Sequence, residues 1–221
     1  MATKNSITVA DHIVKRLAAW NVCRAFGYSG DGINGVMGAL HRAERNPDAA
    51  SIDFIQAAHE ELAGLMAVAH AKFTGEAGVC MVTGGPGAIH LLNALYDAKL
   101  DHQPIVAFVG QSALAGAGGS VQQETNLAAI LQDVASAYCA IVAKSEQVSH
   151  AVDRAFCAAL GGRCVAVVIL PHDVQQEPAV QRRRGASMRA SNRRPASWRH
   201  GCCRPKLNSD TPPKCSLLGR G

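Results

Sequence analysis

The chain lacks any segment that could cross a membrane or direct secretion. Its longest strand-like apolar run, Cys164 to Leu170, is far shorter than the roughly 20 residues that a helix needs to span a bilayer. The segment from Met1 to Leu17 mixes charged side chains among its apolar ones, so it has no apolar core of a secretory signal. We therefore expect a cytoplasmic protein without a transmembrane segment.

The chain also lacks paired cysteines. None of its eight cysteines belongs to a C-x-x-C pair, and Cys202, Cys203 and Cys215 do not have the ligand spacing of a structural zinc site. A free thiol packs as a small hydrophobic group, and five cysteines lie in apolar surroundings: Cys23, Cys80, Cys139, Cys157 and Cys164. We expect these five thiols to be reduced and buried, without a disulfide framework.

Basic residues are scarce in most of the chain. Of the 22 lysines and arginines, eleven lie in residues 179–221, where Asp210 is the only acid. Residues 1–178 hold the other eleven basic residues against 16 acidic ones. A basic chain would favour a nucleic-acid partner, but here the positive charge lies outside the part with hydrophobic periodicity. We therefore expect no specific nucleic-acid partner.

Helical and strand-like patterns alternate along residues 6–171. Such alternation predicts an α/β fold, a three-layer doubly wound parallel sheet of about six strands with helices on both faces. The predicted strands are 22–28, 51–56, 78–83, 104–110, 137–142 and 164–170. Between them, apolar residues at helical spacing predict six helices, of which one closes at Gly75 and the last ends at Gly161-Gly162. No repeat of fixed period is visible.

Hydrophobic periodicity disappears from Gln175 onward. We assign residues 1–178 to the folded domain and predict that residues 179–221 form a disordered basic tail, because too little apolar area is available there to offset the entropy of ordering. Arginine-rich composition with stray Trp and Cys favours the hypothesis that this tail comes from a shifted reading frame. A functional tail that binds nucleic acid or anionic lipid is the alternative.

Two motifs indicate a cofactor site. Glu60, in His59-Glu60-Glu61, stands at a strand-to-helix junction, where a carboxylate is held rigidly. The turn Thr83-Gly84-Gly85-Pro86-Gly87 carries little side-chain bulk, so a flat heterocycle can approach its backbone. Two simpler interpretations remain open: Glu60 as a first-turn acid favoured by the helix dipole, and a plain turn that leads into a helix with Pro86 in its first turn.

A second glycine motif offers a rival hypothesis. Gly30-Asp31-Gly32-Ile33-Asn34-Gly35 matches G-x-G-x-x-G between a predicted strand and a predicted helix, with Asp53 near the acidic position of an NAD-binding Rossmann unit. Two features argue against that interpretation. A full helix precedes the strand, and Asp53 falls inside the next strand instead of at its end.

Beyond these motifs, residues 6–178 resemble the N-terminal pyrimidine-binding domain of thiamine diphosphate enzymes. Among these, the chain looks most like the pyruvate oxidases and quinone-linked pyruvate dehydrogenases, ahead of acetolactate synthase. The residues that carry the resemblance are His59-Glu60-Glu61, Ala71-Lys72-Phe73-Thr74-Gly75, Gly85-Pro86-Gly87, His90-Leu91-Leu92-Asn93, Asp101-His102, Gly110-Gln111, Gln123-Glu124-Thr125, Pro171 and Asp173-Val174. A string of this length in this order is specific.

The resemblance implies roles for individual residues. Glu60 would hydrogen-bond or protonate the pyrimidine N1′ of thiamine diphosphate, so that the cofactor's own 4′-amino group can remove the proton from C2 of its thiazolium. Gln123 would reach toward the substrate, although Gln122 stands where relatives usually have Phe. The other cofactor-binding residues would be Thr83, Gly85, Pro86, Gly87 and His90 around the pyrimidine, and Ser29 in a loop that closes over the cofactor from the partner side. For His90, a place at the subunit contact is the alternative.

The resemblance also implies what else the enzyme needs. FAD and the diphosphate with its Mg²⁺ would be held by further domains, so we expect the chain to be inactive alone. Gly30-Asp31-Gly32 imitates the metal motif, but after Asn46 the next asparagine is Asn93, so we predict no metal ligand here. The partner would be a second copy or a complementary subunit with the diphosphate domain, and the substrate a pyruvate-like 2-oxo acid. A non-catalytic dimerisation module is the alternative.

Overall fold

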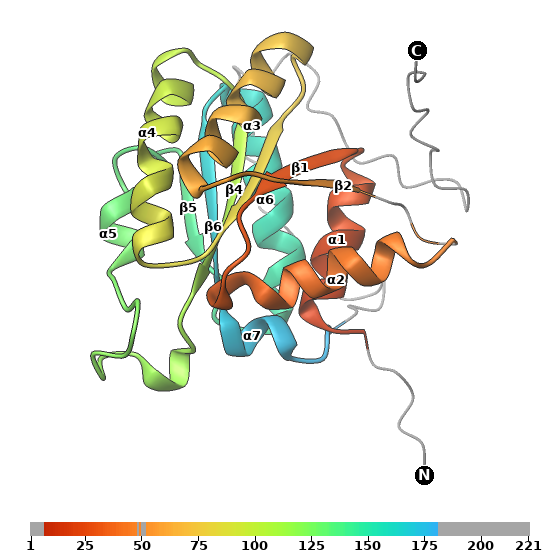
Figure 1. The fold of residues 1–221 in the computed structure, drawn as a ribbon, viewed down its shortest axis with the longest axis vertical. Helices are drawn as coiled ribbons and strands as arrows, with labels where there is room; N and C mark the ends of the chain where they lie inside the picture. Colours follow the sequence, from red (N-terminus) through yellow and green to blue (C-terminus); the bar gives the residue numbers. More distant parts are fainter. Residues whose placement is uncertain (1–6, 48, 50–51, 181–221) are drawn as a thin grey trace, which may run out of the picture.

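The computed structural model describes residues 7–47, 49 and 52–180. Six parallel strands form one sheet in the order β2-β1-β3-β4-β6-β5, which confirms the predicted parallel sheet (Figure 1). The strands are β1 (Arg24–Gly27), β2 (Asp53–Gln56), β3 (Gly78–Val82), β4 (Ile105–Gln111), β5 (Tyr138–Ile141) and β6 (Val165–Pro171). The tail prediction for residues 181–221 lies outside the described residues.

Helices cover both faces of the sheet, as predicted (Figure 1). One face carries α1 (Val9–Ala19), α2 (Asn34–Glu44) and α6 (Val148–Gly162), with the short α7 (His172–Gln176) at its end. The other face carries α3 (Glu60–Thr74), α4 (Pro86–Leu100) and α5 (Leu127–Leu131). Single 3₁₀ turns are η1 (Asp31–Ile33), η2 (Leu114–Gly116) and η3 (Ser145–Gln147).

The core lies on both sides of the central strands. Every residue of β3 and β6 is buried, and so are six of the seven residues of β4. Strands buried on both faces are expected to be continuously apolar, and this is the pattern seen in the sequence of β4 and β6. Within the described part of the chain, no helix is both long enough and apolar enough to span a bilayer.

The cysteine prediction is only partly right. Cys80 on β3 is buried, but Cys23 is exposed because it lies between α1 and β1. The other three thiols are half-buried. An apolar sequence neighbourhood therefore did not determine burial, because the loop before β1 lies at the surface.

The two ends of the domain pack together, which extends the fold beyond the point where periodicity disappears. Gln175 is buried on α7, a helix that the sequence pattern did not reveal. Thr8 forms an antiparallel bridge with Pro178, and the amide of Ala179 donates to the carbonyl of Ile7 at 2.8 Å. The loss of periodicity at Gln175 is therefore not the edge of the folded structure.

The ends of α3 and α6 lie at the glycines that the sequence predicts. Gly75 closes α3 in the left-handed conformation, with φ of 75°, as the sequence indicates. Helix α6 ends at Gly162, within the predicted Gly161-Gly162 stop, but the left-handed cap is Arg163, with φ of 45°, and not a glycine.

The strand order creates one place where loops diverge. The chain leaves β1 through α2 to β2 on one side, whereas β3 pairs with β1 on the other side. In open parallel sheets a ligand site typically forms at such a switch point, beyond the carboxyl ends of the strands. The loops after β1 and β3 meet there.

Candidate functional site

Glu60 is the first residue of α3, directly after β2, and only 8% of it is exposed. His59 caps the helix, because its Nδ1 accepts a hydrogen bond from the Leu62 amide at 3.3 Å. The glutamate thus lies at the positive end of the α3 dipole, which favours a carboxylate. The sequence prediction that Glu60 is held at a strand-to-helix junction is therefore in accord with its place in the fold.

Helix α4 contacts both oxygens of this carboxylate. Oε2 lies 3.1 Å from His90 Nδ1. Oε1 faces Gly87, where an added Cβ would stand 2.9 Å from it, closer than real Cβ atoms normally approach. His90 keeps a side chain 62% exposed, so the pair reaches the surface at the amino ends of α3 and α4. The Glu60 carboxylate is therefore buried, but it is accessible from the surface on the side of His90.

The glycine turn after β3 requires glycine at two positions. Gly85 has φ of 59°, in the left-handed region, and an added Cβ there would stand 2.9 Å from the Gln123 Cβ. At Gly87 an added Cβ would also stand 2.8 Å from Thr83 Cγ2. Pro86 begins α4 and is exposed. The bare backbone of this turn therefore lies beside Glu60.

Thr83 joins this turn to the loop after β1. It is 7% exposed, and its Oγ1 accepts a hydrogen bond from the Gly32 amide at 3.2 Å. An added Cβ at Gly30 would stand 2.6 Å from the Thr83 Cβ, so the two loops pack at backbone distance. Ser29, one residue earlier, is exposed on the loop.

These contacts correct the NAD hypothesis. The glycines of Gly30 to Gly35 make room for the chain's own Thr83 and Gln175 side chains instead of a dinucleotide. Asp53 is the first residue of β2 and is exposed, at the amino end of the strand. In a dinucleotide site the acidic side chain must lie at the carboxyl edge to reach the ribose. The NAD interpretation is therefore wrong.

A cavity of about 300 Å³ lies on the other side of the glycine turn. Gln123 lines it from a left-handed conformation with φ of 64°. Its other lining residues come from the segments that follow β1, β3, β4 and β6 at the carboxyl edge of the sheet: Asp31, Gly32, Gly84, Ser112, Ala113, Gly116, Val121, Gln122 and His172. Glu60, Thr83 and His90 are not among them, so of the predicted site residues Gln123 alone lines this cavity.

Sequence reasoning missed several of the cavity residues. Asp31, Ser112 and His172 each follow a strand closely, after β1, β4 and β6. A search of the first residues after each predicted strand would have found them, because parallel strands bring those positions to one edge. Within the described residues, no group of three or more His, Cys, Asp or Glu side chains is placed to hold a metal ion.

Comparison with known proteins adds a family. Residues 7–130 match the model of the thiamine pyrophosphate enzyme, N-terminal TPP binding domain. The chain is 39% identical over 178 residues to a pyruvate oxidase of Lactiplantibacillus plantarum, covering 80% of this chain and 28% of that protein. It is 38% identical over 170 residues to the putative thiamine pyrophosphate-containing protein YdaP of Bacillus subtilis, covering 77% and 29%.

A more distant relative is the large subunit of acetolactate synthase isozyme 2 of Escherichia coli, 32% identical over 167 residues. That match covers 75% of this chain and 29% of the subunit. The chain therefore spans less than a third of the length of these three relatives.

Proposed function

Because the chain belongs to the family of thiamine pyrophosphate enzymes, as their N-terminal TPP binding domain, we propose that Glu60 is the residue that activates the aminopyrimidine of the cofactor. The observation that carries this proposal is the buried Glu60 carboxylate, with Oε1 against the bare Gly87. A side chain at Gly87 would fill the space beside Oε1.

The residues present fit a flat aminopyrimidine. The turn from Gly84 to Gly87 offers backbone without bulk, and the Glu60 carboxylate can accept a hydrogen bond from a protonated ring nitrogen. Burial keeps water from competing for that hydrogen bond. When bound, thiamine diphosphate supplies the electron sink that stabilises a carbanion, as in decarboxylation of a 2-oxo acid.

His90 orients the carboxylate in this proposal. Its Nδ1 holds Oε2 at 3.1 Å, which directs Oε1 toward the Gly87 side. Glu60 then holds or shares the proton at the ring nitrogen, while Thr83 and Gly32 keep the two loops together at 3.2 Å. These residues bind and orient the ring and control one proton.

The whole reaction is proposed by analogy with the relatives. We propose a pyruvate oxidase-like enzyme of the cytoplasm that decarboxylates a pyruvate-like 2-oxo acid, with Gln123 and the 300 Å³ cavity facing the substrate. FAD, Mg²⁺ and the diphosphate would be bound outside residues 1–178. A second copy or a complementary subunit would meet the apolar residues that α3 and α4 expose, including Leu65 and Ile89. The chain alone is then expected not to turn over pyruvate.

Glu60→Gln tests the function, with Glu61→Gln as a matched control. Both changes remove one charge from the first turn of α3, but Glu61 contacts Asn93 and not the glycine turn. In an assembly that supplies the diphosphate domain, we expect Glu60→Gln to lower pyruvate turnover by about 10²–10⁴ and Glu61→Gln to leave it within about twofold.

Binding of thiamine diphosphate to the chain, followed by NMR, separates the roles further. We expect amide shifts at Gly85 and Gly87 in the wild type and weaker shifts in Glu60→Gln. Full turnover by Glu60→Gln, or shifts confined to other parts of the chain, would contradict the proposal.

A further inference from the structure

Three polar side chains are classed as buried in the described part of the chain, and two of them, Glu60 and Thr83, belong to the candidate site. The third is Gln175 on α7, only 1% exposed. A buried amide is stable only when its donors and acceptor are paired. Its partners therefore indicate what it holds in place.

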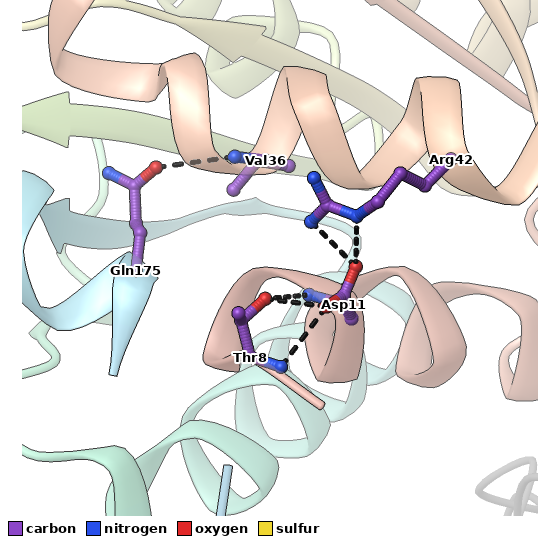
Figure 2. A network of polar contacts seen from close by, with 5 residues as sticks. All are labelled: Thr8, Asp11, Val36, Arg42 and Gln175. Atoms are coloured by element: carbon purple, nitrogen blue, oxygen red, sulfur yellow. Dashed lines mark hydrogen bonds and ion pairs between the residues drawn. The ribbon is translucent and has the colours of Figure 1, made fainter. Parts of the chain in front are cut away.

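Gln175 contacts two segments that are far apart in the sequence. Its Nε2 donates to the carbonyl of Gly32 at 2.7 Å and to the carbonyl of Leu170 at 2.9 Å. Its Oε1 accepts from the amide of Val36 at 3.3 Å, as Figure 2 shows. One amide thus ties the end of β6 to the turn η1 and the start of α2. An added Cβ at Gly35 would stand 2.8 Å from Gln175 Oε1, so glycine makes this approach feasible.

Gly32 connects Gln175 to the candidate site through hydrogen bonds of its carbonyl and its amide. Its carbonyl accepts from Gln175, and its amide donates to Thr83 Oγ1 at 3.2 Å. Thr83 Cγ2 packs against Gly87, and Gly87 packs against Glu60 Oε1. Four consecutive contacts therefore lead from the buried amide on α7 to the carboxylate on α3.

We propose that Gln175 is a positioning residue of the cofactor site, which holds η1 so that the Gly32 amide stays on Thr83 beside the aminopyrimidine. This inference rests on the proposed function of Glu60. The role needs an amide, because only a side chain with two N–H donors and a carbonyl acceptor satisfies two backbone carbonyls and one backbone amide at once. A carboxylate or a thioether of similar size cannot do so.

Gln175→Met is the first test, because it keeps the length of the side chain and removes the amide. We expect hydrogen exchange at the Gly32 amide to become faster by about tenfold, since the carbonyls and the amide that Gln175 served are left unpaired. Gly32 is the informative amide because its own acceptor, Thr83, is unchanged. In an assembly that supplies the diphosphate domain, we also expect thiamine diphosphate to bind about tenfold more weakly to the variant than to the wild type.

Arg42→Ala is the matched control. Arg42 also anchors α2, through an ion pair with Asp11 at 2.7 Å that lies farther along the helix and is exposed (Figure 2). Exposed ion pairs contribute little to folding stability. We therefore expect hydrogen exchange at the Gly32 amide and cofactor binding to stay within about twofold of the wild type.

Gln175→Glu adds a readout that packing alone would not produce. Burial raises the pKa of a carboxyl group, so the variant is protonated at low pH and can donate one hydrogen bond to Gly32 or Leu170. Relative to wild type at the same pH, we expect cofactor binding to be partly rescued at low pH and to weaken as pH rises. For Gln175→Met, the affinity for the cofactor relative to that of the wild type should not change with pH.

The outcomes separate this inference from the proposed function. If Gln175→Met and Gln175→Glu leave Gly32 exchange as slow as Arg42→Ala does, the positioning role is overturned, even if Glu60→Gln behaves as expected. If thiamine diphosphate does not bind to the wild-type chain in an assembly that supplies the diphosphate domain, the proposed function fails and the cofactor role of Gln175 fails with it. Fast Gly32 exchange with a pH-dependent Gln175→Glu variant supports the inference.

Discussion

The two helical layers of this domain differ in their outer surfaces. In the layer of α1, α2 and α6, each helix has one apolar stripe toward the sheet and a polar outer face. In the layer of α3 and α4, the outer faces carry apolar residues as well as polar ones. The exposed large apolar residues of these two helices are Leu62, Leu65, Phe73, Ile89, Tyr96 and Leu100, with exposures from 37% to 91%.

This difference bears on where a partner packs. Apolar side chains that gather on the outer face of a helix mark a surface on which another subunit can pack. Part of the charge on this layer is paired within it, because Lys72 pairs with Asp97 at 3.0 Å and with Asp101 at 2.6 Å. Glu60 and His90 lie at the amino ends of the same helices. A subunit that covers this layer would also enclose the proposed cofactor ring.

The largest expected effect contrasts leucines from the two layers. Leu17 on α1 is fully buried, and Leu17→Ala should lower the free energy of unfolding by about 2–5 kcal/mol through lost burial and a cavity. Leu100 on α4 is 75% exposed, and Leu100→Ala should change it by no more than about 0.5 kcal/mol. Urea unfolding of both variants measures this. Equal losses would mean that the outer surface of α4 is already covered within the chain.

The thiol of Cys80 reports whether the α3–α4 layer stays on the sheet without a partner. Burial raises the pKa of the Cys80 thiol from 9.0 to about 12. Because the folded-state pKa is the higher one, the stability contribution is fully present below pH 9 and is lost as pH rises toward 12. The complete loss would be about 4 kcal/mol.

Alkaline titration of the thiolate absorbance in wild type and Cys80→Ala measures this pKa by difference. A Cys80 that ionises at its ordinary pKa in the folded chain would show that the layer opens.

The exposed face of α3 and α4 should mediate association. Phe73→Ser with Leu100→Ser removes its two most exposed apolar side chains, at 91% and 75%. We expect the wild-type chain to self-associate and the double variant to do so about thirtyfold more weakly, the scale of an interface hot spot. Sedimentation over a range of concentrations measures this. Ile141→Ser, which changes an exposed residue of β5, is the control and should behave as wild type.

The smallest effect concerns the helix ends of the two layers. Gly75 closes α3 in the left-handed conformation, so Gly75→Ala should destabilise by about 1 kcal/mol. Arg163 takes the same conformation after α6, so Arg163→Gly should stabilise by up to about 1 kcal/mol, less the hydrogen bond from its Nη2 to Gln103 Oε1. Thermal unfolding compares them. We expect the two substitutions to change the melting temperature in opposite directions. A change in the same direction would contradict this explanation of the helix ends.

Local pattern alone determined much of this protein. The sequence predicted β4 and β6 from their continuous apolar runs, and α3 from its helical spacing and the glycine at its end. These signals are local, because each depends only on residues that are close together in the sequence. The position of Glu60 between a strand and a helix was also readable, since it depends only on adjacent segments.

Only the tertiary structure decided which distant groups meet. His90 reaches Glu60 across 30 positions, Gly32 reaches Thr83 across 51, and Gln175 reaches Gly32 across 143. Those contacts depend on the strand order. The hydrophobic periodicity of the sequence does not reveal that order, because it is the same whichever strands become neighbours. Asp53 begins β2 beside Arg24, at the amino edge of the sheet, and the contacts of Gly30 and Gly35 show that the glycine motif serves internal packing instead.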